Sequence, residues 1–164
     1  EAAGAIDINK STGENLRAIA AAKKVPVSSL TVVTLDRPRH DQLVAAIREA
    51  GARIKFITDG DVAGAVMAAR PETGIDVLMG IGGTPEGIIA ACAMKCLGGV
   101  IQGRLKPRSE EERERAQAAK LDLNQVLTTN DLVSVSYSVF LMFDDLISLI
   151  IFVPLISSFV IAMA

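Results

Sequence analysis

The chain has 164 residues, of which 17 are basic and 19 acidic, so its formal net charge is −2 at pH 7. Half of the residues are hydrophobic, which is enough to build the core of one ordinary domain. The near balance of charge excludes the strongly basic surface of a nucleic-acid-binding protein, and we expect no nucleic-acid partner.

The first predicted element is a helix over Ser11–Lys24. Ser11 or Thr12 can cap this helix, and Glu14, three positions after Ser11, completes the capping-box pattern. The pattern therefore predicts a helix start close to Ser11.

Strands and helices then alternate along the chain. The predicted strands are short apolar and β-branched runs: Thr31–Leu35, Arg53–Ile57 and Ile75–Met79. The predicted helices follow them, two with apolar residues at helical spacing and a third rich in alanine: His40–Ala50, Asp61–Arg70 and Thr84–Leu97. Units of this kind favour a parallel sheet joined by right-handed crossovers. The predicted fold class is therefore α/β, with a parallel βαβαβα core in layers.

Two cysteines, Cys92 and Cys96, lie four residues apart in the third of these helices. Side chains at this spacing point outward from the helix, which disfavours a disulfide, and no further cysteine or nearby histidine completes a zinc site. We expect two small helix residues in a reducing cytosol.

The end of the chain changes in character. Ser109–Lys120 predicts a charged helix with Ser109 as its cap and glutamates in its first turn. From Leu146 to Ala164 no charged residue occurs, and the length of this run would suit a transmembrane helix. Pro154 interrupts it and no basic flank follows. Three interpretations stay open: a membrane anchor, a buried C-terminal element, or a readthrough peptide without a selected role.

Candidate functional residues follow the predicted strands, because ligands of open parallel sheets bind beyond the carboxyl ends of the strands. After the first strand, Arg37 and Arg39 flank Pro38, which limits the freedom of the loop. Paired guanidinium groups suit a phosphate dianion, although an ordinary charged surface loop would look the same. His40 comes next, and a role at the helix start competes with a catalytic one.

The loop after the second strand holds Asp59, Gly60 and Asp61. Two carboxylates on a tight turn can bind sugar hydroxyls or a divalent cation. Asp61 can equally serve as the cap of the next helix.

A glycine-rich turn follows the third strand. Gly80, Gly82 and Gly83 would let backbone amides approach an anion without a Cβ in the way. Thr84 then fits the N-cap and Pro85 the first helical position. The adjacent Glu86 would repel a bare phosphate, so either a Mg²⁺ or Mn²⁺ ion lies between them or Glu86 is simply an acidic first-turn residue.

Four segments together carry a resemblance to a known family: TVVTLDRPRH, ITDGDVAGA, DVLMGIGGTPEGIIAA and KCLGGVIQGRL. In order and spacing the chain resembles the class II (GlpX-type) fructose-1,6-bisphosphatases from about Gly4 to about Asp131. The resemblance implies a layered fold of the lithium-sensitive sugar phosphatases and hydrolysis of the 1-phosphate of fructose 1,6-bisphosphate with Mn²⁺ or Mg²⁺. Some members of the family also accept sedoheptulose 1,7-bisphosphate. It further implies a cytoplasmic enzyme of gluconeogenesis and glycerol metabolism that forms homo-oligomers at full length.

The resemblance also implies roles for particular residues. Its substrate contacts would be Arg37, Pro38, Arg39, Asp59, Gly60, Asp61 and Gly83, and its metal ligand would be Glu86. No catalytic residue is expected in this chain, because the family's first half supplies further acidic metal ligands and a phosphate loop that are absent before Glu1. We therefore expect the chain to be inactive by itself.

The resemblance ends near Ser134, which predicts two parts: a sugar-phosphatase unit over residues 1–134, and a divergent hydrophobic tail, in which a helix is conceivable, over residues 135–164. The competing hypotheses are a non-catalytic protein tethered to a membrane by its tail and a module that binds a sugar phosphate without hydrolysing it.

Overall fold

The computed structural model describes residues 4–133 and 159–163. Its α-helices are α1 (Thr12–Lys23), α2 (Asp41–Glu49), α3 (Asp61–Ala68), α4 (Thr84–Leu97), α5 (Glu110–Ala118) and α6 (Thr129–Leu132). Its strands are β1 (Thr31–Leu35), β2 (Arg53–Ile57), β3 (Val77–Gly82), β4 (Ile101–Leu105), β5 (Leu127–Thr128) and β6 (Phe159–Met163). Short 3₁₀ helices occupy Val27–Ser29, Pro38–His40 and Pro71–Thr73. The strands form one sheet in the order β2-β1-β3-β6-β4-β5.

The first half of this sheet confirms the predicted α/β arrangement. β1 lies between β2 and β3 and is parallel to both, with Thr31 opposite Arg53 and Val32 opposite Val77. Helices α2 and α3 connect these strands, as the alternation of apolar runs predicted.

The second half is antiparallel at its centre, which the predicted parallel core did not include. β6 inserts between β3 and β4 and is antiparallel to each. β3 and β4 therefore run in the same direction, and their carboxyl ends lie at the same edge of the sheet. Residues 159–163 of the tail, where a helix was conceivable, form a strand instead, because both neighbouring strands offer backbone hydrogen-bonding partners along its whole length.

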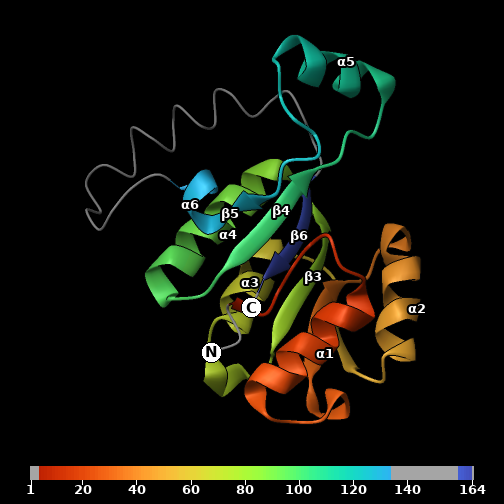
Figure 1. Ribbon diagram of the computed structural model, residues 1–164, viewed down its shortest axis with the longest axis vertical. Helices are drawn as coiled ribbons and strands as arrows, with labels where there is room; N and C mark the ends of the chain where they lie inside the picture. The colour runs from red at the N-terminus through yellow and green to blue at the C-terminus, as the bar shows by residue number, and fades with distance from the viewer. Residues whose placement is uncertain (1–3, 134–158, 164) are drawn as a thin grey trace.

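Helices cover both faces of the sheet (Figure 1). α1 and α2 lie on one face and α3 and α4 on the other, while α5 projects away from the sheet. The side chains of β1 and β3 alternate between two cores, because successive residues of a strand point to opposite faces. Val32, Val77 and Met79 pack toward α1 and α2, whereas Val33 and Leu78 pack toward α3 and α4.

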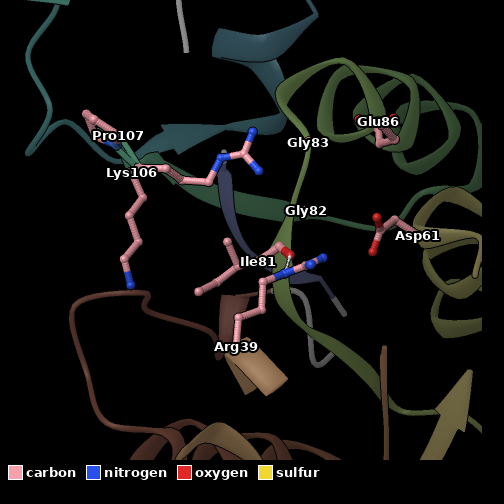
Figure 2. A pocket seen from close by; sticks show the side chains of 9 residues that line it. Arg39, Asp61, Ile81, Gly82, Gly83, Glu86, Lys106 and Pro107 are labelled. Atoms are coloured by element: carbon pink, nitrogen blue, oxygen red, sulfur yellow. Dashed lines mark hydrogen bonds between the residues drawn. The ribbon is translucent and has the colours of Figure 1, made fainter. Parts of the chain in front are cut away.

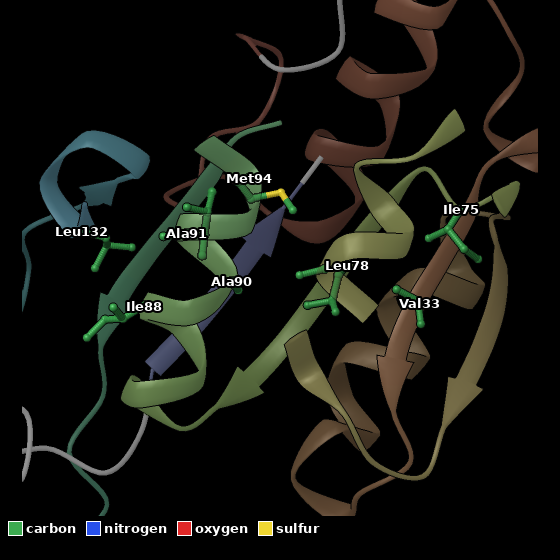
Figure 3. Close-up of a cluster of buried hydrophobic side chains, with 10 residues drawn as sticks. Val33, Ile75, Leu78, Ile88, Ala90, Ala91, Met94 and Leu132 are labelled. Carbon is green, nitrogen blue, oxygen red and sulfur yellow. The ribbon is translucent and has the colours of Figure 1, made fainter. Parts of the chain in front are cut away.

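The core on the α4 side explains why that helix is rich in alanine. Ala90, Ala91 and Met94 are fully buried there, and Ile88 is nearly so. Figure 3 shows these side chains between the sheet and the helices that cover it. The small alanine side chains let the helix pack closely against the sheet. The first turn of α4 lies near the end of β3 because Gly83 alone separates the two elements.

Two predicted helix starts are confirmed by their hydrogen bonds. The Ser11 hydroxyl accepts from the Glu14 amide at 3.3 Å, and the Glu14 carboxylate accepts from the Ser11 amide at 2.9 Å. At α5, the Ser109 hydroxyl accepts from the Glu112 amide at 3.2 Å.

Other predicted boundaries need correction. β3 begins at Val77 rather than Ile75 and runs on through the glycines to Gly82, because β6 pairs with it from Leu78 to Gly82. The N-cap of α4 is Gly83, not Thr84, which is the first helical residue. The helix predicted over Asp61–Arg70 ends at Ala68 as α3.

A further boundary differs at α2. The helix predicted from His40 begins at Asp41, after the 3₁₀ turn Pro38–His40. Proline at the first position of that turn suits its backbone angle, and the three-residue turn carries the chain from β1 into α2.

Both cysteines of α4 are free thiols, as their spacing predicted. Burial raises the pKa of the Cys92 thiol, and the nearby Cys96 adds to the rise. Cys96 is exposed.

Among residues 4–133 and 159–163, no helix has the length and apolar character needed to span a membrane. Residues 146–158 of the proposed anchor lie outside the described part of the chain, and the anchor hypothesis for them stays a prediction.

Candidate functional site

A cleft of about 520 Å³ opens at the carboxyl ends of β3 and β4. It is lined by Arg39, Asp61, Ile81, Gly82, Gly83, Glu86, Lys106, Pro107 and Arg108. Arg39 lies in the turn after β1, Asp61 in the first turn of α3, and Glu86 in the first turn of α4. Three turns that are distant in the sequence therefore meet at one edge of the sheet, as the parallel arrangement predicted (Figure 2).

Ile81 of β3 holds the turn that carries Arg39. The Arg39 Nε donates a hydrogen bond to the Ile81 carbonyl at 2.8 Å, drawn as the dashed line in Figure 2. The Ile81 amide donates in turn to the Nε2 of His40 at 2.9 Å. Because the Arg39 Nε is hydrogen-bonded to β3, its guanidinium group is held at the wall of the cleft.

His40 links β1 and β3 beneath the cleft. The residue is 1% exposed, and its Nδ1 donates to the Leu35 carbonyl at 2.8 Å. These two partners assign the tautomer, with the proton on Nδ1 and the lone pair of Nε2 facing the Ile81 amide. His40 occupies the N-cap position of α2, as the helix-start interpretation expected, but its side chain makes no capping hydrogen bond. Its imidazole is instead a buried connection between Leu35 and Ile81.

Replacing His40 with leucine will destabilise the fold, because it leaves the Ile81 amide and the Leu35 carbonyl without their partner. A buried group left unsatisfied costs about 1–3 kcal/mol. Urea unfolding followed by circular dichroism measures this loss. Arg48→Ala, on the exposed side of α2, is the control and should change stability by about 0.5 kcal/mol or less. Equal stability of His40→Leu and the parent chain would contradict the bridging role.

Gly80 and Gly82 of β3 and the following Gly83 make room for side chains. A Cβ on Gly83 would overlap the Glu86 carboxylate, and one on Gly82 would lie 3.1 Å from the Asp61 Oδ2. A Cβ on Gly80 would lie 3.3 Å from the His40 ring. The expected use of these glycines was to expose amides to an anion. In the structure, the space above Gly82 and Gly83 is occupied by two carboxylates, which the missing Cβ atoms allow to approach the strand end.

Asp61 is not the cap of α3. Gly60 takes the N-cap position in the left-handed region, with φ of 90°, and Asp61 is the first helical residue. Its carboxylate lies against Gly82 instead. Burial raises the pKa of the Asp61 carboxyl above its ordinary value of 3.8, the Glu86 carboxylate raises it further, and the Arg39 guanidinium opposes the rise.

This raised pKa predicts a stability difference between the parent chain and Asp61→Asn. A carboxyl with a higher pKa in the folded chain binds its proton more tightly when folded, so stability falls as pH rises through the window above 3.8. Without divalent metal, Asp61→Asn should therefore be more stable than the parent chain at about pH 7, and the two should converge below about pH 3.8. Urea unfolding in EDTA at both pH values measures this, with exposed Asp36→Asn as the control. A less stable Asp61→Asn chain at neutral pH would refute the burial cost.

Four of the predicted site residues do not line the cleft. Arg37 donates to the carbonyls of Asp36 at 3.0 Å and Thr58 at 2.6 Å, which ties the turn after β1 to the turn after β2. Pro38 begins the 3₁₀ turn, and the exposed Asp59 carboxylate accepts from the Gly60 amide at 2.8 Å. Arg39, Asp61, Gly83 and Glu86 are the predicted residues that the structure brings together.

Sequence reasoning missed the fourth turn of the cleft. Lys106, Pro107 and Arg108 follow β4, a strand that was not predicted. A signal was present, since the order basic residue, proline, arginine in Lys106–Arg108 repeats the pattern of Arg37–Arg39.

The two carboxylates of the cleft have the chemistry of a magnesium or manganese site. Mg²⁺ is commonly held by one or two carboxylates, with substrate phosphate and water completing its shell. Asp61 and Glu86 fit that description as oxygen donors facing one cleft. In the part of the chain that the structure describes, no group of three or more such side chains could hold a metal ion.

Fold and cleft define an α/β protein with a ligand site at the ends of parallel strands, in which a guanidinium group lies across from two carboxylates. A family model described as "Bacterial fructose-1,6-bisphosphatase, glpX-encoded" matches residues 1–142. The chain therefore belongs to this family of phosphatases, which confirms the resemblance seen in the motifs. The division of the chain near residue 134 stays a prediction.

Individual relatives agree with the family. The chain is 51% identical over 104 residues to the "D-fructose 1,6-bisphosphatase class 2/sedoheptulose 1,7-bisphosphatase" of Microcystis aeruginosa, covering 63% of this chain and 30% of that protein. The protein of the same description from Crocosphaera subtropica gives the same values. The "Fructose-1,6-bisphosphatase class 2" of Haemophilus influenzae is 42% identical over 143 residues, covering 79% of this chain and 43% of that protein. The chain thus spans less than half the length of these relatives.

Proposed function

We propose that this chain is the substrate-binding part of a divalent-metal-dependent phosphatase that hydrolyses the 1-phosphate of fructose 1,6-bisphosphate. Sedoheptulose 1,7-bisphosphate, which is named in the description of two relatives, is a second candidate substrate. Membership in the family supports the reaction class, and the cleft supports the part that this chain takes in it.

The observation that carries this proposal is the meeting of Arg39, Asp61 and Glu86 in one cleft. A guanidinium group binds phosphate oxygens through two parallel hydrogen bonds, which fixes both position and orientation. Two carboxylates beside it would repel the same phosphate unless a cation lies between them. A ligand that satisfies both kinds of group is a phosphate ester bound together with a divalent cation.

Asp61 and Glu86 would hold a Mn²⁺ or Mg²⁺ ion. When bound, such an ion neutralises charge on a phosphoryl group and activates water at neutral pH. In this proposal Arg39 orients the ester, and Gly82 and Gly83 allow the two carboxylates to lie close to the strand end. Two carboxylates alone cannot organise a complete metal-activated nucleophile, so we expect binding without turnover from this chain by itself.

The remaining expectations belong to the full-length protein. We propose a cytoplasmic homo-oligomer of gluconeogenic or glycerol metabolism, with the sugar bisphosphate as its small-molecule partner. These proposals rest on the family alone.

Isothermal titration calorimetry tests the proposal. The chain should bind fructose 1,6-bisphosphate more tightly with Mn²⁺ than with EDTA, should bind fructose itself much more weakly, and should release no phosphate. Absence of bisphosphate binding under both conditions would refute the assignment. Phosphate release by the chain alone would refute its predicted inactivity.

A further inference from the structure

A second basic turn lies at the cleft. Lys106, Pro107 and Arg108 directly follow β4, whereas Arg37, Pro38 and Arg39 follow β1 after one intervening residue, Asp36. β4 runs in the same direction as β3, because β6 is antiparallel to both. The carboxyl ends of β3 and β4 therefore meet at one edge, and all three residues of the second turn line the same cleft as Arg39.

Charge is divided across this cleft. In Figure 2, Asp61 and Glu86 lie on one side, Lys106 and Pro107 lie on the opposite side, and Arg39 lies between them. The carboxylate side repels a phosphate dianion unless a cation is bound there, whereas the side of Lys106 attracts one directly. A ligand with two separated phosphates matches this division.

Lys106 has the freedom to meet such a ligand. Its side chain is exposed, and no carboxylate of residues 4–133 lies within ion-pair distance of it. The backbone of the turn is held in place, because Pro107 restricts it and the Arg108 amide donates to the Glu112 carboxylate of α5 at 2.8 Å. Lys106 is thus an exposed cation on a turn whose backbone is held in place.

We propose that the turn Lys106–Arg108 binds the phosphate that is not hydrolysed, with Lys106 as a residue that selects bisphosphates over monophosphates. This inference rests on the proposed function and extends it from the reacting phosphate to the remote one. Arg39 lies between the two sides and contributes to either phosphate, whereas Lys106 acts on the remote one alone.

The test compares two ligands that share the reacting ester. Calorimetry in Mn²⁺ measures the dissociation constants of fructose 1,6-bisphosphate and of fructose 1-phosphate for the parent chain, Lys106→Gln and Lys106→Arg. Lys106→Gln should weaken bisphosphate binding about tenfold, the size of one lost charged hydrogen bond, and leave fructose 1-phosphate binding unchanged. Lys106→Arg should retain most of the preference for the bisphosphate. Lys55→Gln, which removes an exposed charge on β2 outside the cleft, should change neither constant.

Two results would overturn this inference while the proposed function stands. One is unchanged bisphosphate binding in Lys106→Gln while Arg39→Ala still weakens it. The other is an equal loss for both ligands, which would place Lys106 at the reacting phosphate. A parent chain that binds neither ligand would overturn the proposed function together with this inference.

Discussion

Replacing Arg39 with alanine will weaken the binding of fructose 1,6-bisphosphate to this chain by about 10- to 150-fold, because a charged hydrogen bond of this kind contributes about 1.5–3 kcal/mol. Arg39 faces the cleft with its Nε already bonded to the Ile81 carbonyl, so its remaining donors are oriented before the ligand arrives. Preorganisation of this kind places the effect toward the upper part of the range. Calorimetry of the parent chain and the variant gives the ratio of dissociation constants.

A matched pair of variants separates charge from geometry. Arg39→Lys keeps the positive charge but loses the planar fork, and it should recover only part of the binding. Arg48→Ala removes an arginine from the exposed side of α2 and should leave the dissociation constant unchanged. Urea midpoints show whether each variant is folded. An Arg39→Ala chain that is folded and binds as tightly as the parent would remove this turn from the site.

The second large effect concerns Glu86. Glu86→Gln should abolish the increase in bisphosphate affinity that Mn²⁺ produces, because an amide oxygen is a much poorer ligand for a hard cation than a carboxylate. At the aligned position of a full-length class 2 relative, the same change should lower kcat by about 100-fold or more. Even the loss of a residue that only hydrogen-bonds to a metal ligand lowers metal affinity or activity by about 10- to 100-fold.

Gly83→Ala provides an independent route to the same outcome. The new Cβ would overlap the Glu86 carboxylate, which must then leave its position above the strand end. We expect Mn²⁺-dependent binding to fall in this variant, while binding in EDTA stays the same. Glu49→Gln, at the exposed end of α2, is the control for loss of a carboxylate. Normal Mn²⁺ titrations of both Glu86→Gln and Gly83→Ala would exclude Glu86 as a metal ligand.

Local signals in the sequence were sufficient for much of the fold. The caps at Ser11 and Ser109 were predicted because their partners lie within three residues. The alternation of apolar runs predicted β1, β2 and the first half of β3, because strands and helices that pack on a sheet bury apolar residues at characteristic spacings. The same alternation located the turns of Arg39, Asp61 and Glu86 at strand ends, and hence at one edge.

Local signals could not identify contacts between residues that lie far apart in the chain. His40 and Ile81 are 41 residues apart, and nothing near either position shows that an imidazole will accept a hydrogen bond from that amide. Gly82 and Gly83 could serve either to expose amides to an anion or to leave space for carboxylates, and only the positions of Asp61 and Glu86 distinguish these two roles.

The sequence by itself determined the family, the direction of the first three strands and four residues of the cleft, because each depends on motifs or on spacing within about one structural unit. The tertiary structure decided the rest: the insertion of β6 between β3 and β4, the buried role of His40, and the meeting of Lys106 with Arg39. The physical reason is that strand pairing, burial and charge act through space. Which residues they join depends on how distant segments pack, not on how far apart those segments lie along the chain.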